Sequence, residues 1–163
     1  MKMSVGSAKS TRAPRKASFW RKVGALALTS LLLATFGCSS FNRDWRRAEK
    51  QLVGANSVEG RWEGSWKSES NGHHGKLRCL MTHETNSLYQ ARFRASFAGI
   101  FRFNYTAQFE MQPHDTMGWE FDGEANLGKL LGMYYYEGRA TTTNLTSTYR
   151  SKDDHGTFEM ERP

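Results

Sequence analysis

The sequence contains only two cysteines, Cys38 and Cys79, and it has no acidic residue before Asp44. It also lacks the glycine-rich loops that bind phosphates and dinucleotides, and no Ser-His-Asp pattern or pair of carboxylates stands out. A catalyst needs a base within reach of a nucleophile, and the sequence offers no such arrangement. We therefore expect a protein that is not an enzyme and that uses no cofactor.

The positive charge of the chain is confined to its N-terminal segment. The formal net charge is +7, which taken alone would suggest a nucleic-acid partner. Seven of the Lys and Arg residues precede residue 39, and beyond that point 16 Lys and Arg balance 16 Asp and Glu. A neutral domain has no strong attraction for phosphates, so we predict no nucleic-acid partner.

An uncharged and mostly apolar run, "VGALALTSLLLATFG", follows this basic segment and ends at Gly37. Its 15 residues are too few for a membrane span and suit the core of a signal peptide. We predict that residues 1–37 are a signal peptide that is absent from the mature protein. An ordinary signal peptide cleaved nearby and an uncleaved anchor are the alternatives.

The pair Gly37-Cys38 resembles the cleavage site of bacterial lipoproteins, in which the cysteine is lipidated and becomes the new N-terminus. Thr35 and Phe36 depart from the Leu and the small residue that this family prefers. The resemblance implies a lipid anchor on Cys38, a membrane partner and a place in the bacterial cell envelope. Because Ser39 is not Asp, it also implies the outer membrane, facing the periplasm. Cys79 then has no disulfide partner, and we expect a small buried thiol.

Residues 38–58 are predicted to form a linker with a short amphipathic helix. Phe41, Trp45, Ala48 and Leu52 follow one another at helical spacing and form one apolar stripe. So short a stripe binds a membrane surface weakly, so packing on the following domain is favoured.

A period of two begins near residue 59 and is clearest between Tyr89 and Met111, where every odd position is apolar, aromatic or Gly. One straight strand of this length would span roughly 75 Å, so a hairpin is expected. A loop over residues 98–100, with glycine at positive φ, pairs Phe97 with Phe101 and directs the odd positions inward, including the pairs Ala95–Phe103 and Phe93–Tyr105. A sharply bent single strand is the alternative.

Six more strands are predicted near 59–67, 76–84, 117–124, 132–138, 142–150 and 155–162. With the two hairpin arms they make eight short strands. The sequence therefore predicts an all-β domain over residues 59–163, a small antiparallel up-and-down β-barrel, with an open sandwich as the alternative.

The motif Gly60-x-Trp62 resembles the opening of lipocalins and their calycin relatives, whose tryptophan closes the barrel floor beneath an arginine of the last strand. Arg162, at the end of "HGTFEMER", is the matching arginine. The longer chain and terminal helix of a typical lipocalin are absent, and the length is nearer to avidin-like relatives. The resemblance implies a floor of Gly60, Trp62 and Arg162.

Three functions remain open, and the third, an enzyme that a cluster of perturbed titratable groups in a cleft would indicate, has the least support in the sequence. In the first, the barrel binds a small apolar or amphipathic ligand, with Phe93, Phe103, Tyr105 and Phe109 as candidate lining residues. In the second, the same aromatic side chains fill the barrel, which is then a structural or protein-interaction module of the envelope. A cavity of roughly 300 Å³ or more would favour the ligand.

The predicted loops of the open rim contain two further groups of interest. His73, His74 and His155 are weak candidates for a metal site, but their spacing matches no known motif and ordinary solvated turns are favoured, so no metal is expected. Leu127, Leu130 and Leu131 are predicted to form a ligand portal, a partner contact or a plug in the barrel mouth, and the plug is favoured.

The lipid anchor gives the first testable prediction. Replacing Cys38 by Ala removes the thiol that carries the lipid, so the variant should leave the membrane fraction or accumulate as the precursor. Cell fractionation and mass spectrometry of the N-terminus measure both. A variant that is processed and stays on the membrane like the wild type would show that Cys38 is not the anchor.

Overall fold

A computed structural model describes residues 40–54, 56–114 and 118–163 of the chain. The predicted signal segment 1–37 and Cys38 lie outside the described residues, so cleavage and lipidation stay predictions. Within the described ranges, the structure contains no helix with the length and apolar character of a membrane span.

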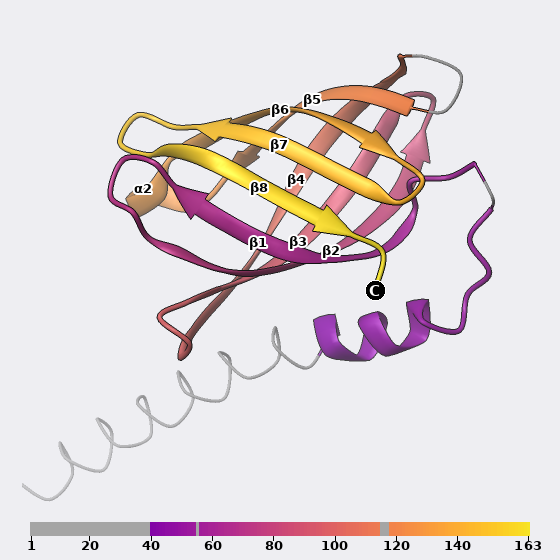
Figure 1. Cartoon of the computed structure of the whole chain (residues 1–163), viewed down its shortest axis with the longest axis horizontal. Helices are drawn as coiled ribbons and strands as arrows, with labels where there is room; N and C mark the ends of the chain where they lie inside the picture. The colour runs from indigo at the N-terminus through magenta and orange to yellow at the C-terminus, as the bar shows by residue number, and fades with distance from the viewer. Residues whose placement is uncertain (1–39, 55, 115–117) are drawn as a thin grey trace, which may run out of the picture. The chain divides into compact units, whose positions relative to one another are not determined.

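Eight antiparallel strands form a closed barrel in which each strand pairs with the next in sequence and the last pairs with the first (Figure 1). The strands are β1 (Gly60–Ser68), β2 (His74–Thr85), β3 (Leu88–Phe97), β4 (Phe101–Pro113), β5 (Gly118–Asn126), β6 (Met133–Thr141), β7 (Asn144–Arg150) and β8 (His155–Glu161), with a short helix α2 (Gly128–Leu131) between β5 and β6. The predicted all-β barrel is confirmed, and the open sandwich is wrong.

The core follows from the alternation of side chains along each strand. In β7, for example, buried and exposed residues alternate along the whole strand. Trp62, Phe93 and Phe109 are among the largest fully buried side chains. Cys79 is also buried, as expected, and its burial raises the pKa of the thiol.

The hairpin of β3 and β4 has the predicted register, with Phe97 opposite Phe101, Ala95 opposite Phe103 and Phe93 opposite Tyr105. Ala98 shares the positive φ of its turn with Gly99 (51° and 75°), although only the glycine was expected to adopt it.

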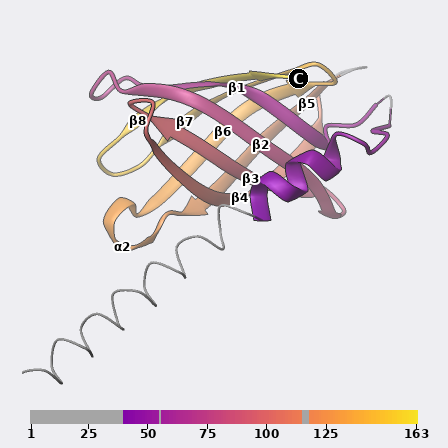
Figure 2. The same ribbon diagram turned by 90° about the horizontal axis from the view of Figure 1, so that it is seen from below.

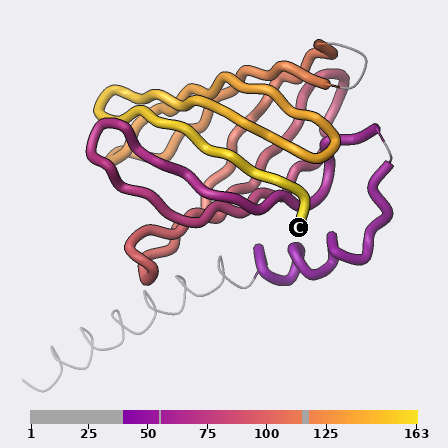
Figure 3. The backbone as a smooth tube through the Cα atoms, viewed as in Figure 1, coloured from indigo at the N-terminus to yellow at the C-terminus, as the bar shows by residue number. Residues whose placement is uncertain are grey.

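The expectation that this whole face lies in the interior is wrong at the end of the hairpin. Phe101 is 61% exposed and Phe103 is 39% exposed. The reason is that β5 pairs with β4 only from Gln108 onward, so residues 101–107 have no partner strand on that side. Figure 3 shows the hairpin projecting beyond its neighbours at the lower left.

The N-terminal helix spans residues 40–48 and lies against the outside of the barrel (Figure 2). Phe41 and Trp45 form a second apolar cluster with Leu80 of β2. Asp44 pairs with Arg92 of β3 at 3.0 Å, and the hydrogen bond from this arginine lowers the pKa of the carboxyl. Packing on the barrel is therefore confirmed. The predicted stripe is wrong at Leu52, which lies beyond the end of the helix and is fully exposed.

One end of the barrel is sealed by Trp62 and Arg162. The indole N–H donates to the carbonyl of Val58 at 2.8 Å, and the Arg162 Cζ lies 4.0 Å from the centroid of the Trp62 ring. The contact expected between these two side chains, within roughly 6 Å, is thus present. Gly60 has a φ of 98°, and a Cβ there would lie 3.2 Å from Arg162 Nη1.

The Arg162 guanidinium also binds backbone carbonyls from two chain segments. It donates to Ser57 at 2.7 Å, to Thr142 at 3.1 Å and to Arg61 at 3.4 Å, and a further bond goes to the carbonyl of Glu59. The side chain therefore joins the segment that leads into β1 to the turn between β6 and β7.

The floor predicts an order of mutational effects. Trp62→Ala should destabilise the barrel by about 3–5 kcal/mol, because a fully buried aromatic is lost. Arg162→Ala should cost about 2–3 kcal/mol, because it removes charge-assisted hydrogen bonds as well as the contact with the ring. Arg150→Ala, which removes an exposed ion pair with Glu137, is the control and should cost under about 1 kcal/mol. Urea unfolding measures all three, and an Arg162 variant as stable as the wild type would rule out a structural floor.

Candidate functional site

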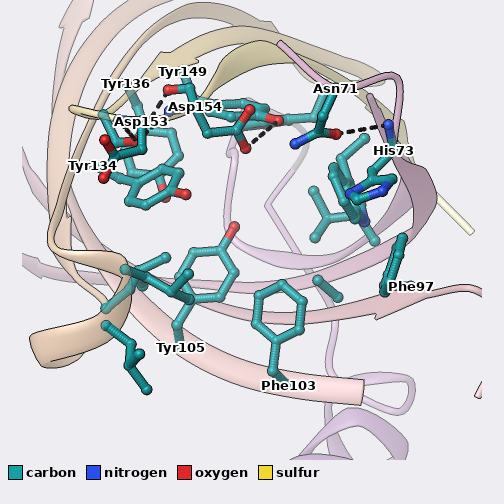
Figure 4. Close-up of a pocket in the computed structure, with 18 of the residues that line it drawn as sticks. Asn71, His73, Phe97, Phe103, Tyr105, Tyr134, Tyr136, Tyr149, Asp153 and Asp154 are labelled. Carbon is teal, nitrogen blue, oxygen red and sulfur yellow. Dashed lines mark hydrogen bonds between the residues drawn. The ribbon is translucent and has the colours of Figure 1, made fainter. Parts of the chain in front are cut away.

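A cavity of about 350 Å³ opens at the end of the barrel opposite the floor (Figure 4). It exceeds the roughly 300 Å³ that a small-molecule pocket requires. The described residues that line it are Trp66, Asn71, His73, Leu77, Ala95, Phe97, Phe101, Phe103, Tyr105, Leu127, Leu130, Leu131, Tyr134, Tyr136, Tyr149, Ser151, Asp153, Asp154 and Phe158.

Large side chains fill the barrel below the cavity. The rings of Phe109 and Phe121 stack with centroids 4.6 Å apart, and those of Phe93 and Tyr105 stack at 4.9 Å. Phe93 and Phe109 are fully buried in this packing and do not line the cavity, so two of the four predicted lining residues are wrong. Phe103 and Tyr105 do line it.

Ala95 explains in part why space remains at this end. It is buried, lines the cavity and faces the partly exposed Phe103 across the β3–β4 pair. The small residues Ala91 and Ala107 also face each other but lie within the packed core, so they contribute no space to the cavity.

Four tyrosines line the cavity, and we call Tyr105, Tyr134, Tyr136 and Tyr149 the tyrosine cluster. Burial raises the pKa of Tyr105, Tyr136 and Tyr149 above the ordinary value. These three hydroxyls therefore stay protonated at neutral pH and can donate hydrogen bonds.

Asp154 is held beside the tyrosine cluster by two hydroxyl groups. Ser68 Oγ donates to one carboxylate oxygen at 2.6 Å, and Tyr149 Oη donates to the other at 3.4 Å. Figure 4 shows Tyr134, Tyr136 and Tyr149 on the same side of the cavity as Asp153 and Asp154, with Tyr105 on the opposite wall. No pattern in the sequence indicated this contact between Asp154 and Tyr149.

The three histidines do not gather at one point, as a metal site would require. His73 lines the cavity with its ring 4.6 Å from that of Phe97, whereas His74 and His155 do not line it. Across the described residues, no group of three His, Cys, Asp or Glu side chains has the geometry to hold a metal ion.

His155 instead helps to join two rim loops. Its Nδ1 lies 2.8 Å from Ser70 Oγ, and its Nε2 lies 3.8 Å from a carboxylate oxygen of Glu69. Ser70 Oγ also accepts the backbone N–H of His155 at 3.0 Å. Neither Ser70 nor His155 lines the cavity, so this serine–histidine–glutamate contact has no access to a ligand bound there.

The leucines after β5 border the cavity without plugging it, so the favoured prediction is wrong. Leu127 packs against the core, but Leu130 is 96% exposed and Leu131 is 51% exposed. They line the cavity together with Phe103, whose stretch of β4 lacks a partner on β5. We call this exposed apolar edge of the cavity, formed by Phe103, Leu130 and Leu131, the portal.

Fold and site together define a class of protein: a closed antiparallel β-barrel with a sealed floor and an apolar, tyrosine-rich cavity at its open end. No protein-family model matches the sequence, and no curated protein shows significant similarity to it.

Three solved structures have a similar fold. The first is a de novo designed fluorescence-activating β-barrel, with 15% identity over 69% of this chain and 100% of that one, at a TM-score of 0.45. The second is a redesigned β-barrel, mFAP1, bound to DFHBI, with 13% identity over 64% of this chain and 94% of that one, at a TM-score of 0.47. The third, EF1p2_mFAP2b bound to DFHBI, has 11% identity over 65% and 94% of the two chains, at a TM-score of 0.48. Because these sequence identities and TM-scores are low, the proposed function rests on the cavity and not on the structural similarity.

The buried tyrosines predict a loss of stability at alkaline pH. An unfolded tyrosine loses its proton near pH 10, whereas burial keeps Tyr105, Tyr136 and Tyr149 protonated in the folded state. Above about pH 10 the unfolded state therefore binds fewer protons than the folded state, so the free energy of unfolding should fall as pH rises. Each of these tyrosines should contribute about 1.4 kcal/mol of this fall per pH unit. Urea unfolding between about pH 8 and 11 measures this fall, which should be shallower in Tyr136→Phe. Constant stability over that range would contradict it.

Proposed function

We propose that this chain is a cell-envelope lipoprotein whose barrel binds a small apolar or amphipathic ligand without transforming it. The observation that carries the proposal is the cavity of about 350 Å³ at the open end, with its largely apolar wall. The envelope location rests on the basic segment, the short apolar run and the pair Gly37-Cys38, and the Cys38→Ala experiment tests it.

The cavity favours ligand binding over a filled structural barrel. Protein interiors are close-packed, and voids much larger than a water molecule are few. This barrel obeys that rule around Phe93 and Phe109 but not at its open end. A protein whose barrel was only a structural support would gain stability by filling this space with larger side chains at positions such as Ala95.

The portal favours the same function. Leu130, Leu131 and Phe103 expose apolar surface to water beside the cavity, and exposed apolar patches commonly mark sites of ligand or partner binding. A ligand that enters between β4 and α2 would cover part of it. The cavity volume is at the lower end of the range of roughly 300–1,000 Å³ for small-molecule sites, so the ligand is small.

The polar groups of the cavity support binding more than catalysis. The protonated tyrosine hydroxyls are poor bases, and Asp154 is engaged by Ser68 and Tyr149. Among the described lining residues, no hydroxyl or thiol lies beside a histidine that could activate it. The proposed role of these groups is to orient the polar end of a ligand.

Filling the cavity tests the proposal. Ala95→Leu places three more carbon atoms where Ala95 lines the cavity, so it should weaken binding of the neutral apolar probe N-phenyl-1-naphthylamine roughly tenfold while leaving the fold intact. Fluorescence titration of the protein from Ser39 onward measures the affinity. This protein retains the compact unit Cys38–Pro163 except for Cys38 itself.

Ala91→Leu is the matched control for packing. Ala91 lies in the filled core, so the same substitution there should destabilise the barrel by about 1–3 kcal/mol, whereas Ala95→Leu should cost less because it enters open space. If the wild-type protein bound no probe, or if Ala95→Leu left the affinity unchanged, the cavity would not be the binding site.

A further inference from the structure

The charged and aromatic side chains of the cavity point to the chemical class of its ligand. We propose that the cavity selects amphiphiles with a cationic ammonium head group over those with a carboxylate. This inference rests on the proposed function, because it requires that the cavity binds a ligand at all.

The first observation is the charge of the wall. Asp153 and Asp154 line the cavity, and among the described lining residues there is no lysine or arginine. A site for a fatty-acid carboxylate is expected to supply a cation, most often the paired N–H groups of an arginine. Asp153 is exposed, but Asp154 is half-buried, so the effective dielectric constant around Asp154 is below that of water and its carboxylate attracts a cation more strongly than an exposed one would.

The second observation is the tyrosine cluster beside these acids. Tyr134 and Tyr149 lie with ring centroids 5.9 Å apart, and Tyr136 is on the same side of the cavity (Figure 4). The face of an aromatic ring carries partial negative charge and attracts a cation within roughly 6 Å of its centroid. Several aromatic rings beside an acidic group form the kind of site that binds quaternary ammonium groups.

Two further contacts indicate a negative local potential. The charge of Asp154 adds to burial in raising the pKa of Tyr149, so the field of the carboxylate reaches this ring. Both side-chain hydrogen bonds to the Asp154 carboxylate come from neutral hydroxyl groups, those of Ser68 and Tyr149, which fix the carboxylate in place. A second carboxylate beside it would meet repulsion.

The exposed cations near the rim do not reverse this preference. Lys129 in α2, Arg102 in β4 and Lys152 in the loop before β8 are exposed, and none of them lines the cavity. Their fields pass through water and salt, which screen them within roughly 10 Å.

Three probes of equal chain length separate charge from apolar contact: octyltrimethylammonium, octan-1-ol and octanoate. Isothermal titration calorimetry of the protein from Ser39 onward, near neutral pH and at low salt, gives their dissociation constants. The ammonium probe should bind about tenfold more tightly than octanol, and octanoate more weakly than octanol. Added sodium chloride should reduce the preference for ammonium without weakening octanol.

Two pairs of variants assign the preference to residues. Asp154→Asn should reduce the ammonium-to-octanol ratio several-fold, and Asp122→Asn, the same change on an exposed residue of β5, should leave the ratio unchanged. Tyr134→Phe retains the ring and should retain most of the ratio, whereas Tyr134→Leu should reduce it. Because each ratio compares two probes on one variant, a general loss of stability does not mimic the effect.

The outcomes separate this inference from the proposed function. If octanol binds but octanoate binds as tightly as ammonium or more tightly, the cationic preference is wrong and the ligand cavity stands. The same conclusion follows if the ratio does not respond to salt or to Asp154→Asn. If none of the three probes binds, the proposed function fails, and this inference fails with it.

Discussion

The pairing of β1 with β8 is the constraint on which the rest of the structure depends. It runs from Glu63 opposite Glu161 to Ser68 opposite Gly156, and it removes the two open edges that an eight-stranded sheet would otherwise expose. The close approach at this seam requires glycine on both strands. A Cβ on Gly64 would lie 1.9 Å from the carbonyl oxygen of Glu159, and a Cβ on Gly156 would lie 2.0 Å from that of Lys67. The alternation of glycine and tryptophan in "EGRWEGSW" thus serves two purposes, since the indoles fill the interior while Gly64 allows the ring to close.

Closure also makes the two ends of the barrel unequal. It brings the start of β1 next to the end of β8, where Arg162 covers Trp62 and binds the carbonyls around it. The aromatic side chains above this floor pack closely, and the cavity lies at the opposite, open end of the barrel. There β4 extends past β5, and residues 101–107 border the cavity without a neighbouring strand on that side. The cavity and its portal are therefore consequences of unequal strand lengths as much as of small side chains.

The sequence predicted the register and faces of β3 and β4, but it did not predict how deeply each side chain is buried. A period of two gave the register of β3 and β4, because a slip of one residue would have turned Arg102 inward. The same pattern treats Phe93 and Phe103 alike, although one is buried in the core and the other borders the portal. That difference depends on where β5 ends, which no local pattern encodes. The exposure of Leu130 and Leu131 and the contact of Tyr149 with Asp154 likewise depend on how separate loops meet at the rim.

The charge balance of the domain bears on how the cavity can select a ligand. From residue 39 onward acidic and basic residues are equal in number, so no strong net charge draws a ligand in from a distance. On the outer wall, ion pairs between neighbouring strands, such as Glu63 with Arg78 and Glu137 with Arg150, offset one another locally. Asp154 differs because the side chains that hydrogen-bond to its carboxylate are the neutral hydroxyl groups of Ser68 and Tyr149, which hold the carboxylate in position. The proposed selection by charge must therefore act at short range, inside the cavity mouth. There Asp154 and the tyrosine cluster line the same space. Under this proposal, a barrel without net charge would still discriminate between head groups of opposite charge.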